Sequence, residues 1–331
     1  MESRNPELPP LPPPPGAISA LVNGFNAIAS NVAVILIPAI LDLFLWLGPR
    51  LKADALLSPM LELLSQIQAQ VPADQAREIG LAATDFANNF NLFSVFRTFP
   101  LGIFSLMITK MSIKSPLGDR IGIDVPYWLL AFGIILILTF CGWLGGSLYF
   151  RAVSRVALRL EKGPGLFRSV LHGILLSGIW LLFFSIVSLP LSIFFALLSL
   201  LDSLLRTILI FLLVVPISWV LLAVFFSFHG IFASAQNAFI SVRNSVRMLR
   251  YCLPALGWFA MLTILISQGM DMLWRIPPAD SWMMGIGILG HAFVSTSLLA
   301  ASFIYYRDLN AWIETALQWL KTQKTTSSAR A

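Results

Sequence analysis

The chain has 331 residues, of which 57% are hydrophobic and only 11% are charged. Soluble domains carry charge on roughly a quarter of their residues, so this composition excludes a water-soluble globular protein. The net charge of +6 comes from basic residues in short segments between long apolar stretches, not from a separate polar domain. This placement favours anionic lipid headgroups as partners and argues against nucleic acid.

Residues 1–16 are rich in proline and predict an extended polyproline II arm. The arm has neither the basic region nor the short apolar core of a cleaved signal peptide, so we expect the first hydrophobic segment to be retained. Such an arm is either a solvated tether or a ligand for an aromatic groove.

Long uncharged stretches dominate the rest of the chain. A helix of ~20 apolar residues crosses the ~30 Å hydrocarbon core of a membrane, and several of these stretches are long enough. They predict six transmembrane helices, at about residues 32–48, 126–150, 169–190, 207–228, 253–274 and 284–306. The predicted fold class is therefore all-α, a polytopic membrane helical bundle that comprises residues 17–306.

Lys and Arg predict the orientation of the bundle, because these residues are retained on the cytoplasmic side. The 151–168 connection holds five basic residues and one acid, and the 229–252 connection holds three basic residues and no acid. The alternate connections are poor in basic residues, except for residues 49–125, where basic and acidic residues balance. We therefore predict that both termini are cytoplasmic.

Two apolar segments do not fit a simple crossing. One helix over residues 169–201 would be about 50 Å long, so we expect Pro190 to end or kink it and the rest to lie along the outer interface. Residues 92–111 are apolar but contain Arg97 and Pro100. A span there would place a basic connection outside, so we expect this segment to be interfacial or re-entrant.

Amphipathic segments precede three of the spans. In the clearest, residues 239–250, an apolar stripe and three arginines face different ways, which predicts a helix in the headgroup plane. Residues 17–31 and 151–167 resemble it, so we predict three units of an interfacial helix plus a hairpin. The cytoplasmic tail, residues 307–331, predicts a further amphipathic helix. In residues 239–250, the apolar stripe comprises Phe239, Val242, Val246 and Leu249, and the candidate anionic-lipid contacts are Arg243, Arg247 and Arg250.

The long 49–125 connection is predicted to be an extracytoplasmic helical insertion. Residues 54–70 and 72–90 each have one apolar face and are separated at Pro72, which predicts a helical hairpin. The hairpin is either a lid over the outer ends of the spans or a cap that binds a partner.

Two segments and the six-span plan carry a resemblance to a known family. The segments are AFISVRNSVRMLRYCLPALG (Ala238–Gly257) and FIYYRDL (Phe303–Leu309). Over most of residues 17–310 the chain resembles six-span bacterial proteins related to the membrane domain attached to some glycerophosphodiester phosphodiesterases. The resemblance implies a protein of the bacterial cytoplasmic (inner) membrane. The hydrolase of that family is a separate soluble domain, for which this chain has no room, and the 49–125 insertion departs from the family plan.

No motif indicates a reaction. The chain lacks GxGxxG, Walker A, HExxH, GxSxG and paired-cysteine patterns, and His172, His229 and His291 are far apart in the sequence. Cys141 and Cys252 are isolated and are expected to behave as small apolar residues. We therefore expect no metal, no cofactor and no enzymatic activity.

Polar residues inside the predicted spans are candidates for function, because burying them in hydrocarbon is costly. Five of them fall at similar depth near the outer ends of three spans and are expected to form one cluster. Such a layer would admit a headgroup or a proton; the alternative is a structural cluster whose members satisfy one another. The five residues are Asp42, Gln268, Asp271, Arg275 and His291.

These features predict a non-enzymatic bacterial integral membrane protein that interacts with or organises membrane lipid, alone or as a subunit of an assembly. The alternative is a transporter or lipid-translocating channel that uses the outer polar layer. A water-filled cavity that reaches this layer favours transport, and a closed, dry bundle favours a scaffold.

Overall fold

The computed structural model describes residues 11–68, 73–108, 110, 112–161, 163–198 and 201–328. Its fold is all-α, as predicted. The helices are α1 (Ala17–Ala29), α2 (Leu36–Leu47), α3 (Asp54–Gln68), α4 (Ala73–Asn89), α5 (Trp128–Leu158), α6 (Leu166–Leu198), α7 (Ser203–Ser234), α8 (Ala238–Trp274) and α9 (Met284–Ser328). Two 3-10 helices, η1 (Val32–Ile35) and η2 (Leu92–Phe96), precede α2 and follow α4.

Within the described residues, five helices, α5 to α9, are long and apolar enough to cross a membrane. A sixth candidate is the pair formed by α1 and the segment Val32–Leu47, which bends by 93° at the break between them. The structure therefore confirms a polytopic helical bundle, and the apolar helices indicate a multi-pass membrane protein.

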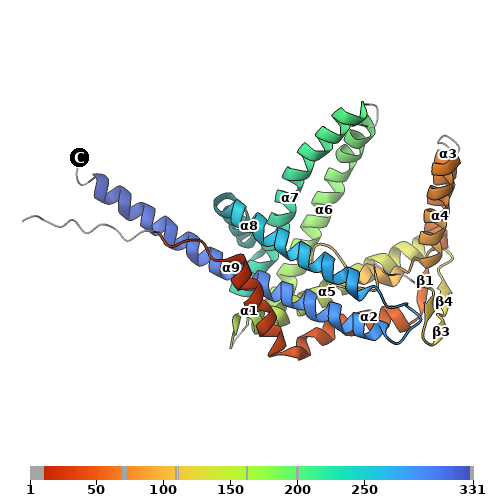
Figure 1. Ribbon diagram of the computed structural model, residues 1–331, viewed down its shortest axis with the longest axis horizontal. Coiled ribbons are helices and arrows are strands. Elements are labelled where there is room, and N and C mark those ends of the chain that lie inside the picture. The colour runs from red at the N-terminus through yellow and green to blue at the C-terminus, as the bar shows by residue number, and fades with distance from the viewer. Residues whose placement is uncertain are drawn as a thin grey trace, which may run out of the picture.

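α9 is the centre of the bundle. In its most apolar stretch 78% of the residues are buried, against 6% in the corresponding stretches of α6 and α7. α1, α5 and α8 pack around it, and α2 contacts it as well (Figure 1). Because α9 touches protein rather than lipid, it can carry the small and polar residues that a lipid-facing helix excludes.

The sequence pattern of α1 predicts a helix that lies alone in the headgroup plane. In the structure, α1 instead packs lengthwise on α9. Gly24 allows the close approach: a Cβ atom there would lie 2.5 Å from the backbone nitrogen of Ala301. Nearby, Phe25 meets Phe293 edge to face, with ring centroids 5.9 Å apart. The apolar face of α1 is therefore covered by protein, and α1 is the first limb of a bent pair.

Two other predicted interfacial helices are the ends of longer helices. α5 continues without a break to Leu158, and α9 continues through the predicted tail helix to Ser328. Val153 on α5 and Ile313 on α9 are buried in the bundle, so their apolar faces pack against protein. The prediction of three equivalent units is therefore wrong for the second unit, and the tail is not a separate helix.

The described part of the proline-rich arm touches α9. The indole Nε1 of Trp312 donates a hydrogen bond of 2.8 Å to the carbonyl oxygen of Pro12. Residues 1–10 of the arm lie outside the described residues. The contact places the start of the described chain beside the C-terminal half of α9, so both lie toward one end of the molecule (Figure 1).

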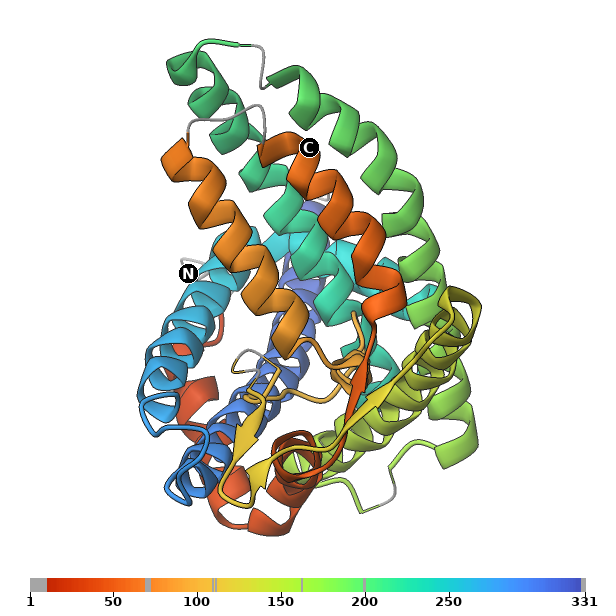
Figure 2. The same ribbon diagram turned by 90° about the vertical axis from the view of Figure 1, so that its right-hand side faces the viewer.

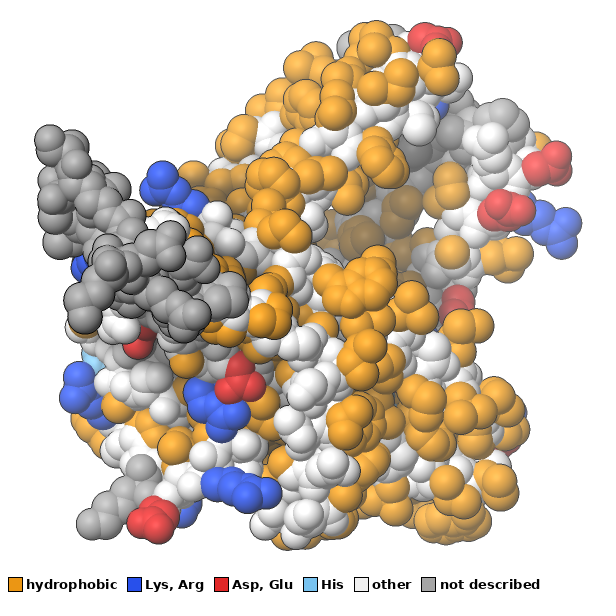
Figure 3. Space-filling model, turned by 60° about the vertical axis from the view of Figure 1, so that its left-hand side comes forward, with side chains coloured by type: hydrophobic (Ala, Val, Ile, Leu, Met, Phe, Trp, Pro, Cys, Tyr) orange, Lys and Arg blue, Asp and Glu red, His pale blue; other side chains and the backbone are white. Residues whose placement is uncertain are grey.

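α6 and α7 form a long hairpin that projects from the bundle (Figures 1 and 2). α6 continues through Pro190 to Leu198, so this proline does not end the helix, and the alternative of a kink at Pro190 stays a prediction. Its 33 residues span about 50 Å, a length that tilting in a membrane accommodates. Apolar side chains cover the projecting hairpin, and the molecule is hollowed beneath it (Figure 3). This surface suits contact with lipid.

The 49–125 insertion contains the predicted helical hairpin, α3 and α4, which projects in the same direction as α6 and α7, at the right of the view (Figure 1). Residues 69–72, which include Pro72, lie outside the described residues. Two strand pairs accompany the hairpin, β1 with β4 in parallel and β2 with β3 antiparallel. Strands this short carry no alternating pattern, so the sequence did not predict them. The strands are β1 (Arg50–Lys52), β2 (Lys114–Ser115), β3 (Gly118–Asp119) and β4 (Gly122–Asp124).

Residues 97–108 form an irregular segment that runs through the bundle beside α5, and Leu101 and Leu106 in it are fully buried. We call it the re-entrant segment. The GxxxG pattern of Gly142 and Gly146 predicts close packing of two helices. Instead, these glycines admit the re-entrant segment: a Cβ on Gly146 would lie 2.9 Å from the backbone of Gly102. Irregular backbone is tolerated at membrane depth where protein buries it, as here.

We predict that Gly146→Ala destabilises the protein by about 1–3 kcal/mol, because the added methyl group collides with backbone rather than with a movable side chain. Gly133→Ala on the same helix is the matched control, since a Cβ there meets no atom within 4 Å. The thermal unfolding midpoint of both variants in detergent is the measurement. Equal midpoints would show that the re-entrant segment does not pack on Gly146.

Candidate functional site: a polar layer beside an apolar cavity

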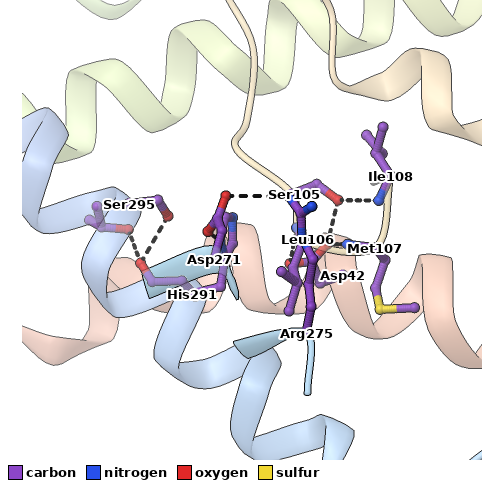
Figure 4. Close-up of polar contacts among 11 residues, drawn as sticks. Asp42, Ser105, Leu106, Met107, Ile108, Asp271, Arg275, His291 and Ser295 are labelled. Carbon is purple, nitrogen blue, oxygen red and sulfur yellow. Dashed lines mark hydrogen bonds and ion pairs between the residues drawn. The ribbon is translucent and has the colours of Figure 1, made fainter. Parts of the chain in front are cut away.

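Asp271, Arg275 and His291 lie together between α8 and α9 (Figure 4). The Nδ1 atom of His291 is 2.8 Å from Asp271 Oδ1, and Arg275 Nη2 is 3.6 Å from Asp271 Oδ2. The carboxylate thus fixes the orientation of the imidazole ring. His291 is only 6% exposed, and its Nε2 atom has no hydrogen-bond partner among the described residues. This buried nitrogen is an unused hydrogen-bonding group at the site.

Asp42 is fully buried on α2 and is held by the re-entrant segment (Figure 4). Its carboxylate accepts hydrogen bonds from the Ser105 hydroxyl, the Leu106 N–H at 3.0 Å and the Met107 N–H at 3.1 Å. None of the hydrogen bonds described for Asp42 comes from the other four residues of the predicted cluster. Asp42 therefore serves the backbone of the re-entrant segment, and of the two aspartates it is Asp271 that contacts His291 and Arg275.

A cavity of about 730 Å³ lies between α7, α8 and α9. It is lined by side chains from residues 218–226, 253–268 and 295–299. Its walls are mostly apolar, and Phe104 of the re-entrant segment contributes to them. Gln268 also lines the cavity, so it lies apart from the ion-paired group but on its border.

A kink in α8 creates this cavity. Before the kink, Ser245 donates a hydrogen bond of 2.7 Å to the carbonyl oxygen of Ala223, which holds α8 against α7. Cys252 then has a non-helical backbone conformation, two residues before Pro254. After the kink α8 is held by α9: the Tyr305 hydroxyl donates a hydrogen bond of 2.9 Å to the carbonyl oxygen of Ala255. The cavity lies between α7 and this second limb.

The polar edge of the cavity adjoins the ion-paired group. Gln268 lies one turn before Asp271 on α8, and Ser295 lies one turn after His291 on α9. Both Gln268 and Ser295 line the cavity. An amphiphile whose chain filled the apolar part would therefore place its polar end near Asp271 and His291.

The insertion contributes two further basic residues, Lys110 and Arg97, and Lys110 contacts the end of α8. The Lys110 ammonium donates hydrogen bonds to the carbonyl oxygens of Arg275, at 2.5 Å, and of Pro277. Arg97, at the start of the re-entrant segment, is exposed. In the sequence it interrupts an apolar run. A charged residue within such a run is the signal that could have identified it.

The three arginines predicted to contact anionic lipid lie on the first limb of α8. Arg243 and Arg250 are exposed, whereas Arg247 is half-buried. Phe239 and Val246, from the predicted apolar stripe, are exposed at 79% and 51%. This limb therefore offers an apolar and a basic surface, but its serine face is buried on α7, so it does not lie alone in the headgroup plane.

Among the residues that the structure describes, no group of three or more His, Cys, Asp or Glu side chains is arranged to hold a metal ion. No protein-family model, curated protein or solved structure matches the chain. The resemblance to the membrane domain of glycerophosphodiester phosphodiesterases therefore stays a prediction. The chemistry of the site rests on the residues of this chain alone.

We predict that Asp42→Ala loosens the re-entrant segment, because the Leu106 and Met107 N–H groups lose their acceptor. Each buried, unsatisfied donor costs about 1–3 kcal/mol. Trypsin should then cut the detergent-solubilised protein faster after Arg97 or Lys110, as mass spectrometry of the fragments would show. Asp271→Ala is the control, since that carboxylate accepts no bond described from the segment. Equal cleavage of both variants would contradict this role for Asp42.

Proposed function

We propose that the protein binds a membrane lipid in the cavity between α7, α8 and α9, as a non-enzymatic integral protein of the bacterial cytoplasmic membrane. The cavity is the observation that supports this proposal. Its volume of about 730 Å³ falls within the ~300–1,000 Å³ of ligand pockets. Its apolar walls suit an acyl chain, and the polar edge at Gln268 and Ser295 suits a headgroup.

The walls of the cavity favour entry from the lipid phase. Met261, Ile264 and Leu265 of α8 line the cavity and are also exposed on the surface of the protein, at 44%, 60% and 66%. Exposed apolar side chains on a membrane-spanning helix face hydrocarbon. A lipid chain can therefore enter sideways between α7 and α8 without crossing water.

The ion-paired group favours binding over reaction. An enzyme needs a nucleophile or a second acid–base group within hydrogen-bond reach of a common substrate position. Ser295 is the hydroxyl nearest in sequence to His291 on α9, but its Oγ donates to the carbonyl oxygen of Ala292 at 3.4 Å. Asp271 and His291 therefore supply a polar contact for a headgroup without an evident nucleophile.

A transporter or lipid-translocating channel is the second candidate function. It is favoured by one observation: the cavity reaches the level of Gln268 and Ser295, next to the Asp271–His291 pair. Translocation would need a polar path past this layer, whereas lipid binding needs only the lateral opening. The apolar lining of the cavity supports lipid binding first.

We predict that Gly257→Phe blocks lipid binding. Gly257 lines the cavity, and a Cβ there meets no atom within 4 Å, so a phenyl ring can occupy the space meant for the chain. A phospholipid with a photoreactive diazirine in mid-chain should label residues 253–268 of the unmodified protein in nanodiscs. Peptide mass spectrometry should find this label at least about fivefold reduced in the variant, as loss of a few CH₂ contacts implies.

Gly269→Phe is the matched control, because Gly269 lies on the same helix, is equally open and does not line the cavity. Labelling of residues 253–268 should be unchanged in this variant. If Gly257→Phe labels as strongly as Gly269→Phe, the cavity does not hold the chain.

We also propose that both termini are cytoplasmic, with the α3–α4 hairpin outside. Contact between Pro12 and Trp312 at one end of the molecule supports an even number of crossings. In a background without Cys141 and Cys252, cysteines at Ser65 and Thr84 should react with a membrane-impermeant thiol reagent in intact cells. Cysteines at Glu161 and Ser234 should react only after lysis. All four positions are exposed, so burial does not mask the result. The reverse pattern would overturn this orientation.

A further inference from the structure

Three polar side chains of α8 line the cavity close to one another. They are Thr263, Ser267 and Gln268, which together span about 8 Å along the helix axis. We call them the polar row. All three are uncharged, and they combine two hydroxyl groups with an amide, so the row can both donate and accept hydrogen bonds. The wall that α8 gives to the cavity is therefore apolar except for a row of neutral hydrogen-bonding groups.

The polar row makes no hydrogen bonds within the described part of the chain. The Oγ1 atom of Thr263 has no partner there, and neither Ser267 nor Gln268 takes part in a hydrogen bond. A hydroxyl on a membrane helix can instead bond to the backbone carbonyl four residues earlier. Ser185, which faces away from the cavity on α6, does so and donates to the Leu181 oxygen at 2.8 Å. The row therefore retains hydrogen-bonding groups that a ligand can use.

The lining of the cavity offers no charge to a ligand. Among the residues that the structure describes, no Asp, Glu, Lys, Arg or His side chain lines it. The ion-paired group lies beyond the lining, and within it Asp271 already has His291 and Arg275 as partners. An ionised phosphate at the polar row would therefore lack a counter-charge, and burying an unpaired charge is costly.

The depth of the polar row also favours an uncharged ligand. α8 ends at Trp274, an aromatic residue typical of the membrane interface. Helical rise places Gln268 ~9 Å and Thr263 ~16 Å from that end, within the hydrocarbon layer. A phospholipid can send an acyl chain into the cavity while its phosphate stays in the headgroup plane. Only a lipid with an uncharged end can bring that end to the row at little cost.

We propose that the lipid bound in this cavity is neutral, of the diacylglycerol class, and that its ester and hydroxyl groups lie at the polar row. This inference rests on the proposed function, because it assigns the class of the lipid whose chain fills the cavity. Ester carbonyl oxygens accept from hydroxyls, and the glycerol hydroxyl can both donate to and accept from an amide such as that of Gln268. The unused groups of the row and the polar end of such a lipid thus satisfy one another.

Photolabelling of the full chain in nanodiscs tests the class of lipid. The two probes are diacylglycerol and phosphatidylglycerol with the same diazirine-bearing acyl chain. For each probe, the label on residues 253–268 is divided by the label on residues 207–215 of α7, which are mostly exposed and do not line the cavity. This ratio corrects for unequal partition of the probes. In the unmodified protein it should be about tenfold higher for diacylglycerol, as two hydrogen bonds of ordinary strength imply.

A triple variant removes the polar row. It should lose the preference for diacylglycerol and keep the phosphatidylglycerol ratio of the unmodified protein, which also shows that the cavity still forms. A matched control removes three hydroxyls from exposed positions of α6 that do not line the cavity, and it should keep the preference. The row variant is Thr263→Val, Ser267→Ala and Gln268→Leu, and the control is Ser185→Ala, Ser188→Ala and Ser192→Ala.

The outcomes separate the two proposals. If the row variant keeps the preference while Gly257→Phe lowers both ratios, the assignment to a neutral lipid is overturned and the cavity proposal stands. A ratio in the unmodified protein that is equal for both probes, or higher for phosphatidylglycerol, overturns the assignment as well. If Gly257→Phe lowers neither ratio, the cavity proposal itself fails.

Discussion

The burial of irregular backbone inside an apolar bundle is the constraint on which the rest of this structure depends. Hydrocarbon offers no partner to a backbone N–H group, so the re-entrant segment must find its partners within the protein. Asp42 accepts from two consecutive N–H groups and from Ser105, and the glycines of α5 let the segment approach closely. A carboxylate that looks functional in the sequence is thereby explained as a structural acceptor.

The re-entrant segment also brings together features that lie far apart in the chain. Phe104 comes from the insertion, the other cavity walls come from α7, α8 and α9, and Asp42, which the segment binds, comes from α2. The kink at Cys252 opens the space, and the segment closes one side of it. An apolar cavity with a polar edge results, which is the shape that an amphiphile requires.

Two other buried polar pairs of the bundle have their partners within the protein and need no ligand to explain them. His229 Nε2 lies 2.7 Å from Ser302 Oγ, and the Tyr149 hydroxyl lies 2.9 Å from Thr296 Oγ1. These pairs link α7 and α5 to α9, where paired polar groups stabilise close helix contacts. The Asp271–His291 pair differs from these two because it lies one turn from the cavity-lining Gln268 and Ser295 and because His291 Nε2 has no partner among the described residues.

The sequence alone determined the class of the protein and most of its helices, because a long uncharged stretch satisfies its own backbone hydrogen bonds in a membrane by forming an α-helix. It also placed Gln268, Asp271, Arg275 and His291 at similar depth, since helical rise converts sequence position into depth. Only the tertiary structure decided which of them meet, because depth says nothing about which way a side chain faces. The same limit explains the errors at α1, α5 and α9: an amphipathic pattern requires an apolar partner, and it does not distinguish lipid from a neighbouring helix. Likewise Gly142 and Gly146 require a close neighbour, and only the fold shows that this neighbour is an irregular segment.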